Sequence, residues 1–359
     1  MKDIFVGVQQ LRNFIETVFI HEGVQTMAAK QAADTLLYAD LSGLDTHGVL
    51  NLLSIYITGI RDRRIDISAE MTVLRDQEAV MGLNANRMLG LNAGEKAMHN
   101  AIHKAKKFGV GVVSVCNSTH FGAAGYYSQL ALSEDMLGLA MTNLGAEPVA
   151  HAMGSRQPVI GTNPLSLAVP VDRLPDFVLD MSTTICASGK IKQARERKCN
   201  IPKEWLYDKH GDPVTDPDAY YSKKAFLPGL GGWEKTSGGH KGFGLNMMVE
   251  ILSGVLSGAD VSLLEKQNEC NNIGHFFLVL NTAYFMSVPA FKKRMMRMLE
   301  RYLETKMFDN FPPLHYAGYP DEILRDKRNK FGVPIPATLF EELNVHAQQN
   351  NIQLLESIL

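Results

Sequence analysis

The sequence predicts an α/β protein that does not use the standard Rossmann arrangement. Apolar residues recur at helical spacing in the N-terminal segment, between Val8 and about Leu44. The run "GVGVVSV" at 109–115 follows a helical segment and has the β-branched density of a buried strand. The dinucleotide fingerprint GxGxxG is absent, because Val112 and Val113 stand where a turn and a helix would be needed.

Helical periodicity predicts two amphipathic helices between Val8 and about Leu44, separated at "HEGV". Further helices are predicted over 94–108 and 126–136. The segment 245–256 is almost wholly apolar, so we expect a helix that is buried on nearly all sides.

Strands are predicted over 109–115, 137–142, 164–169 and 177–180, with one more from Gly274. The glycine-rich segment "PGLGGWEKTSGGHKGFG" is predicted to be a loop. Residues 290–306 form an amphipathic pattern that is basic on one face. The proline-rich end of the chain is predicted to be loop plus a short helix.

The composition bounds the size and the charge of the protein. The chain has 359 residues, 45% hydrophobic and 21% charged, which is enough for two or three packed substructures. Its 36 basic and 38 acidic residues leave a net charge of -2, which gives no overall field to attract nucleic acid or an anionic membrane. We therefore expect a small-molecule partner, and neither nucleic acid nor a membrane.

The spacing of the cysteines and the composition of the N-terminal segment indicate the cellular compartment. Cys116, Cys186, Cys199 and Cys270 lie far apart and form neither a disulfide scaffold nor a paired zinc pattern. No signal-type apolar run develops at the N-terminus, and no later stretch reaches the ~18 apolar residues of a membrane span. We expect a soluble cytoplasmic protein with no bound metal.

Several common motifs are missing. The segment "GLNAGEK" from Gly90 has one residue too few between its glycines for a phosphate loop, and it is predicted to begin a helix. Neither a GxSxG elbow nor an HExxH pair occurs. Hydrolase chemistry therefore loses support.

Two histidines stand at the ends of predicted elements, where binding groups tend to lie. His120, in "STHFGAAG", follows a strand, and an imidazole can exchange a proton with a reacting carbon–oxygen group near neutral pH. The small residues after it leave space for a ligand. His47, in "DTHGV", closes a helix. Each also has a structural interpretation, His47 as a helix C-cap and His120 as a satisfied group at a strand end.

Three further stretches place polar groups at turns. Thr162 and Asn163 in "GTNPLSLAVP" open a strand, where they are also typical of plain turn chemistry. "VLDMSTT" ends a strand at Asp180 and adds hydroxyl groups suited to ribose or phosphate oxygens, or to an N-cap. "GGHKGFG" places His240 and Lys241 at a helix start, where free N–H groups and a cation favour an anion.

Taken in this order, these five stretches resemble the type 2 malate/L-lactate dehydrogenase family. That family includes malate, lactate, sulfolactate, ureidoglycolate and diketogulonate oxidoreductases and cyclic-imine reductases. The resemblance extends over roughly residues 11–303. "GK" at Gly189 and "IP" at Ile201 also stand where the family has signature blocks. A single matching block would be weak evidence for the family, but the same blocks in the same order are specific to it.

The resemblance implies a fold and an assembly. It implies a non-Rossmann α/β fold with a mostly antiparallel central sheet that binds NAD or NADP, and a helical domain formed from both chain ends. The implied boundaries are 1–75 for the helical domain, completed by 310–359, and 76–309 for the sheet domain. A homodimer is also implied.

The resemblance further implies hydride transfer between nicotinamide and C2 of a small 2-hydroxy or 2-oxo acid of the malate, lactate or ureidoglycolate type. His120 and His47 match the two positions to which proton transfer is assigned in different members, and we favour His120. The implied cofactor residues are Asn143, Asp180, Met181, Ser182, Thr183, His240, Lys241, Pro320, Asp321 and Glu322. The implied substrate residues are Asn51, Thr162 and Asn163.

Two departures from the family pattern bear on the substrate. Asn51 stands where the family usually has an arginine, which is the natural bidentate clamp for a carboxylate. Three arginines that follow, Arg61, Arg63 and Arg64, are candidates to replace it. The stretch "TNLGAEP" is longer by one residue than the usual "SNTxP" and carries Glu147.

These departures leave two alternatives open. One is a reductase of cyclic imines or of N-substituted amino acids with the same fold, and the other is a cofactor-binding homologue without turnover. The choice between NAD and NADP is also open, because the acidic-versus-basic rule for the ribose belongs to the Rossmann fold.

Overall fold

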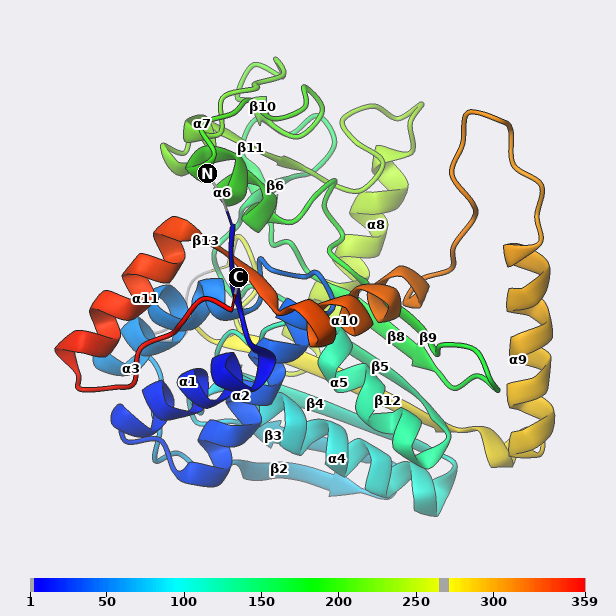
Figure 1. The fold of residues 1–359 in the computed structure, drawn as a ribbon. Helices are drawn as coiled ribbons and strands as arrows, with labels where there is room; N and C mark the ends of the chain where they lie inside the picture. Colours follow the sequence, from blue (N-terminus) through cyan, green and yellow to red (C-terminus); the bar gives the residue numbers. More distant parts are fainter. Residues whose placement is uncertain (1–2, 265–270, 359) are drawn as a thin grey trace.

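The computed structural model describes residues 3–264 and 271–358 and is built around a seven-stranded sheet (Figure 1). The strand order is β2-β3-β4-β12-β5-β8-β9. Every neighbouring pair is antiparallel except β3 with β4. The strands are β2 (Thr72–Gln77), β3 (Val80–Asn84), β4 (Val110–Ser118), β5 (Met136–Thr142), β8 (Leu165–Val169), β9 (Phe177–Met181) and β12 (Ile273–Asn281). The prediction of an α/β protein with a mostly antiparallel central sheet is confirmed.

Both faces of this sheet are covered. Phe277 of β12 packs with α4 (Gly90–Phe108) and α5 (Ala124–Leu130), while its neighbour Phe276 packs with α8 (Gly239–Glu250). Successive side chains of a strand point to opposite faces. The apolar run at 276–280 of β12 is therefore explained by burial on both sides.

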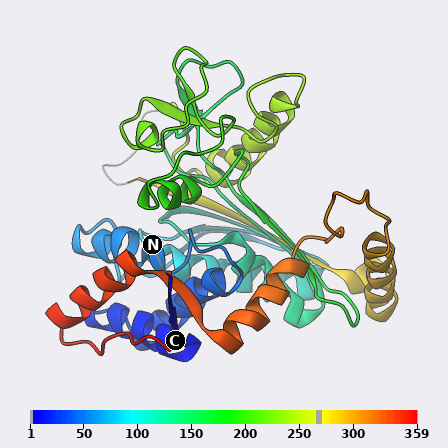
Figure 2. The same ribbon diagram turned by 45° about the horizontal axis from the view of Figure 1, so that its top comes forward.

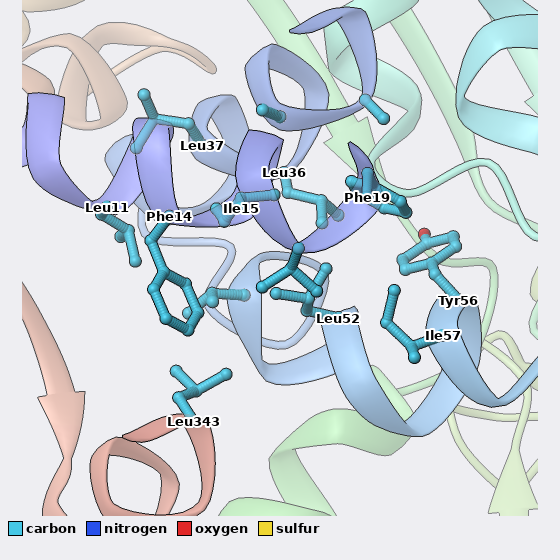
Figure 3. Packing of buried hydrophobic residues seen from close by; sticks show 14 of the residues in the cluster. Leu11, Phe14, Ile15, Phe19, Leu36, Leu37, Leu52, Tyr56, Ile57 and Leu343 are labelled. Atoms are coloured by element: carbon cyan, nitrogen blue, oxygen red, sulfur yellow. The ribbon is translucent and has the colours of Figure 1, made fainter. Parts of the chain in front are cut away.

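The two ends of the chain form one helical layer. α1 (Val8–His21) and α2 (Thr26–Leu41) share a hydrophobic core with α11 (Ala337–Gln349), and β1 (Asp3–Val6) pairs with β13 (Val333–Pro336). Figure 3 shows side chains from both ends in this cluster, among them Leu11, Phe14, Leu36, Tyr56 and Leu343. The helical part built from both chain ends is confirmed, and the exact domain boundaries remain predictions.

A second, four-stranded sheet was not predicted. Its order is β10-β11-β6-β7, and it lies with α6 and α7 on the opposite side of the central sheet from α1 and α2 (Figure 2). Its strands are only two to four residues long, too short to show a period in the sequence. The elements are β6 (Ala150–His151), β7 (Pro158–Ile160), β10 (Tyr207–Asp208), β11 (Ala225–Pro228), α6 (Ser188–Glu196) and α7 (Asp218–Tyr221).

The helices predicted from periodicity are present, with shifted ends. α4 begins at Gly90, and the helix predicted over 126–136 is α5 followed by a 3-10 turn at Ala131–Glu134. α2 ends at Leu41, so His47 lies in the following turn and not in the last turn of a helix. The remaining helical segments are Val49–Asn51, Leu52–Ile57, α3 (Thr58–Arg61), Ile251–Val255, Thr282–Tyr284, α9 (Val288–Leu303) and α10 (Tyr319–Phe331).

The prediction for the C-terminal part is wrong. In place of loop plus a short helix, this part contains two 13-residue helices, α10 and α11, with β13 between them. Pro320 lies in the first turn of α10 and Pro336 immediately precedes α11. Proline has no N–H group to lose at these positions, so its density did not exclude helices.

The predicted burial of the helix at 245–256 is also wrong for the single chain. Met247, Ile251 and Val255 are 43%, 50% and 61% exposed. The buried side carries Asn246 and Glu250, whose side chains accept hydrogen bonds from Asn163 at 2.7 and 2.6 Å. An apolar surface is therefore left facing outward on α8 and the turn after it.

Candidate active site

A cavity of about 390 Å³ lies where the segments that follow α2, β4 and β9 meet α6. Such a volume is within the range of small-molecule sites, about 300–1,000 Å³. Its wall includes the turn 43–47, the small residues 122–124 and residues 180–182 and 184–188, with Thr162 and Lys190.

The two predicted histidines meet at this cavity. His47 lies on the wall, and His120 lies just before the wall residues Gly122 and Ala123. The centroids of the two imidazole rings are 6.0 Å apart and the rings are nearly parallel, at 17°. Segments far apart in the sequence therefore bring two proton-carrying rings to one place.

Hydrogen bonds fix the orientation of His120. The backbone N–H of Gly122 donates to its Nδ1 at 3.2 Å, and the hydroxyl of the buried Tyr56 lies 2.8 Å from the same nitrogen. A nitrogen that accepts from a backbone N–H carries no proton. In the neutral ring the proton is thus on Nε2, which can donate to an oxygen of a bound molecule.

Burial keeps both imidazoles neutral at pH 7. Desolvation lowers the pKa of His47 to about 4. Desolvation, together with the nearby His47, lowers the pKa of His120 to about 3. The Oγ1 atom of Thr46 lies 2.8 Å from Nδ1 of His47 and orients that ring.

Asp180 places an acid group on the same wall. Burial raises its pKa to about 7, with a smaller contribution from the charge of Asp321, while the N–H of Gly125 donates to its Oδ2 at 2.7 Å and opposes the rise. Ser182 and Thr184 line the cavity beside it. This group of acceptors and hydroxyls, next to a wall of small residues, suits the hydroxyl-rich ribose and flat ring of a nicotinamide cofactor.

A second cavity, of about 400 Å³, lies at the start of α10. Asp321 and Glu322 line it, together with Tyr38 and Val178, whereas Pro320 is exposed beside it. Gly125 is in contact range of both the Tyr38 hydroxyl and Asp180, so Asp180 lies between the two cavities. The two cavities are thus neighbours, with Asp180 on the wall of the first and Tyr38 on the wall of the second.

The sequence matches the malate/L-lactate dehydrogenase family over residues 6–344. The chain belongs to this family. It is 35% identical over 349 residues to the malate dehydrogenase of Pyrococcus abyssi, covering 97% of this chain and 95% of that protein. It is 29% identical over 350 residues to the NAD(+)-dependent ureidoglycolate dehydrogenase of Escherichia coli, covering 96% of each. The malate dehydrogenase structure from Entamoeba histolytica has a TM-score of 0.94 at 33% identity, covering 98% of this chain and 99% of that one.

Not every predicted site residue of this dehydrogenase lies on the cavity wall. Thr162, Asp180, Met181 and Ser182 do. His240 and Lys241 are exposed at the start of α8, which packs against the wall residue Leu230 through Gly242.

The other predicted residues are buried and bonded elsewhere. The side-chain amide of Asn51 donates to the carbonyl of Thr46 at 2.9 Å, and that of Asn143 donates to the carbonyl of Asp260 at 2.7 Å. The hydroxyl of Thr183 donates to the carbonyl of Asn163 at 2.9 Å. These groups hold the segments that carry the site.

The candidate arginines lie outside the cavity. Arg61, Arg63 and Arg64 are exposed, and Arg61 forms an ion pair with Glu22 while Arg64 pairs with Asp62 at 3.4 Å. The predicted replacement of the family arginine by one of these three is therefore not seen in this structure.

Sequence reasoning missed two polar side chains next to the histidines. Tyr56 is fully buried in the core of the helical layer. Its neighbours in the sequence are mostly apolar, so nothing in the sequence indicated a polar contact with His120. His275 lies within β12, where Ser118 and Thr142 hydroxyls contact its two ring nitrogens at 2.7 and 2.8 Å. Its ring stacks on Phe121 at 4.6 Å, one residue from His120.

Across the part of the chain that the structure describes, no three side chains of His, Cys, Asp or Glu are grouped as metal ligands. Within the same residues, none of the helices combines the length and apolar character of a membrane span. Cys116, Cys186 and Cys199 are free thiols, and Cys270 lies outside the described residues.

Proposed function

We propose that this protein interconverts a small 2-hydroxy acid and the corresponding 2-oxo acid with NAD or NADP as the hydride carrier. The observation that most strongly supports the proposal is the pair of stacked imidazoles, of which His47 lines a cavity that also carries Asp180 and His120 lies directly behind it. Family membership and relatives named for malate, sulfolactate and ureidoglycolate support the same class of substrate.

We assign the cofactor to the two neighbouring cavities on either side of Asp180 and Tyr38. Asp180, Met181 and Ser182 would hold its nicotinamide half, and Asp321 and Glu322 its other half. His240, Lys241 and the backbone around Thr183 and Asn143 would contribute from the α8 side. When bound, the cofactor supplies or accepts a hydride at the substrate carbon that bears the oxygen.

His120 is the proposed proton-transfer group. Its Nε2–H is oriented by the contacts at Nδ1 and would hydrogen-bond to the carbonyl oxygen of the substrate. An anionic substrate beside the ring would raise the lowered pKa and favour a second proton on Nδ1, from which the Tyr56 hydroxyl oxygen would accept a hydrogen bond in place of the Gly122 N–H contact. Transfer of the Nε2 proton would then leave a neutral ring. His47 would orient the substrate oxygen from the facing ring.

The test combines cofactor binding with turnover. NADH and NADPH are titrated by fluorescence, and oxidation of the bound cofactor is then followed with a panel of 2-oxo acids and cyclic imines. The proposal expects turnover with at least one 2-oxo acid. Turnover with imines alone would instead support the imine reductase, and binding without turnover would support a non-catalytic homologue.

We predict that His120→Ala lowers kcat by about two to four powers of ten, because proton transfer by a positioned side chain contributes about that much. Its effect on the Kd for NADH is expected to be small. The matched variant His47→Ala should lower kcat less and raise KM more. If NADH binding collapsed in His120→Ala while turnover per bound enzyme stayed normal, the assignment of proton transfer would be wrong.

We further propose that the protein acts as a homodimer in the cytoplasm. The exposed apolar surface of α8 supports the dimer, because monomeric proteins rarely expose contiguous apolar patches of this kind. Free thiols at Cys116, Cys186 and Cys199 suit a reducing compartment.

A further inference from the structure

The cavity has one cationic side chain of the lysine or arginine type among its described wall residues, that of Lys190 in α6. The acidic wall residues are Asp45 and Asp180. Asp45 is already paired with Arg328, which approaches it from α10. A small anion entering the cavity therefore meets a single uncommitted cation.

The position that would carry an arginine in this family does not supply a charge. Asn51 is 8% exposed, and its amide turns toward the carbonyl of Thr46. The arginines that follow it are at the surface. A carboxylate bound next to the histidines must therefore be neutralised from another side of the cavity.

Packing places Lys190 close to His47. A Cβ atom added at Gly189 would lie 2.2 Å from the Cβ of Thr46, so the first turn of α6 rests directly against the residue before His47. The missing side chain at Gly189 is what allows this approach. The first turn of α6 holds no acidic residue, and its N-terminal end adds partial positive charge.

Few groups compete for the Lys190 ammonium group. Its nitrogen lies 5.8 Å from the centre of the Trp205 ring, a contact that leaves its hydrogen-bond donors available. Cys186 is the nearby acid, and burial raises the pKa of this thiol to about 12, so it remains uncharged at neutral pH. Among the described residues, no carboxylate forms an ion pair with Lys190 at hydrogen-bond distance.

We propose that Lys190 binds the carboxylate attached to the reacting carbon of the substrate, and is the cation on which this chain relies where Asn51 supplies no charge. This assignment rests on the proposed 2-oxo acid chemistry. Lysine offers a compact ammonium charge, whereas arginine offers a planar guanidinium group with two parallel donors. The site should therefore require an anion at this position. It should tolerate varied groups at the other end of the substrate.

The experiment compares a charged and a neutral substrate in wild type and Lys190→Met. NADH or NADPH oxidation is measured with pyruvate, oxaloacetate and methyl pyruvate. Loss of the cation that would bond to the carboxylate should raise KM for both acids by about 10-fold or more, the effect of a hydrogen bond to a charged group. The Kd for the cofactor and the kcat/KM for the neutral ester should stay close to the wild-type values, and Lys190→Arg should restore much of the acid activity.

Lys192→Met, on the same helix but outside the cavity wall, is the matched control, and circular dichroism checks the fold of each variant. If Lys190→Met does not fold, Lys190→Arg and Lys190→Gln provide the same comparison. An unchanged KM for pyruvate would overturn the assignment, and so would a loss confined to oxaloacetate, which would place Lys190 at the distal carboxylate. If wild type turned over none of the 2-oxo acids, the proposed function itself would fail, which is a separate outcome.

Discussion

At the residue scale, the site is built from buried imidazoles. His47, His120 and His275 all have pKa values lowered to between about 3 and 4 by desolvation. His275 is the structural member of the group, because hydroxyl groups contact both of its nitrogens and its ring supports Phe121. Of the two others, His47 lines the cavity and His120 stacks on it at 6.0 Å between ring centroids. Keeping all three rings neutral avoids placing several positive charges in one buried cluster.

The lowered pKa of His275 predicts acid sensitivity of the fold. Below pH 6.5 the unfolded chain binds a proton at this residue that the folded chain does not bind until about pH 3, so stability falls as the pH falls through this window. Between pH 6.5 and 5 the contribution is about 2 kcal/mol.

We expect the free energy of unfolding of wild type to lose about 2 kcal/mol relative to His275→Gln over this window. Urea unfolding of both proteins at pH 7 and pH 5 measures the difference, and the other titrating groups cancel in the comparison. A constant difference between the two proteins would show that His275 does not titrate as the buried environment requires.

At the scale of elements, the helices and strands that could be predicted from the sequence are the long and regular ones. β4 and α4 have strong periodicity and were located to within a few residues, and the position of His120 at the end of β4 followed from them. The short strands of the second sheet have no period, and α10 was hidden by Pro320 in its first turn and by the prolines on either side of it. Family resemblance found Asp180, but only packing reveals that His275 of β12 lies beside His120.

The helix α10 connects the second cavity to the loop that carries His47. Arg328 is 8% exposed and donates to both the carbonyl of Asp40 and the carboxylate of Asp45. One turn earlier, Arg325 donates to the hydroxyl of Ser42 at 3.0 Å and pairs with Glu322 at 2.7 Å. The hydrogen bonds and ion pairs of these two arginines therefore join α10 to the turn that precedes His47.

Arg328→Met should loosen this connection. It removes the guanidinium from Asp45 and from the buried carbonyl of Asp40, and we expect about 2–4 kcal/mol of destabilisation, below the full cost of a deeply buried pair because Asp45 is partly exposed. Chemical denaturation measures the loss, and hydrogen exchange at residues 42–48 should become faster. The control is Lys327→Met, an exposed neighbour on the same helix, which should change neither quantity. Unaltered exchange in Arg328→Met would mean that α10 does not hold the loop.

At the scale of the whole molecule, the central sheet acts as the frame on which the site is assembled. It delivers His120 from the end of β4 and Asp180 from the end of β9, and the helical layer adds His47 from the opposite side. The second sheet carries α6 and Lys190 to the remaining wall. Each wall thus comes from a different packed unit, so the cavity depends on how these units are held together.

The single chain exposes large apolar side chains on its outer surface. The α8 region exposes Met247, Ile251 and Val255, and α9 with the loop after it extends away from the rest of the molecule (Figure 1). That loop exposes Phe308 and Phe311 by 81% and 58%. A second copy of the chain offers apolar surfaces of the same kind, which is the arrangement that a two-fold interface requires.

The dimer prediction is therefore specific to the α8 surface. Introducing two charges there, with Ile251→Glu and Val255→Glu combined, should oppose burial of this surface, because an unpaired charge is costly to remove from water. Sedimentation velocity should give twice the 39.7 kDa chain mass for wild type and the single chain mass for the double variant. Met27→Glu changes a residue that is 68% exposed on α2 and should remain dimeric. A double variant that still sediments as a dimer would place the interface elsewhere. A wild type that sediments as a monomer would mean that the apolar surface of α8 is tolerated in water.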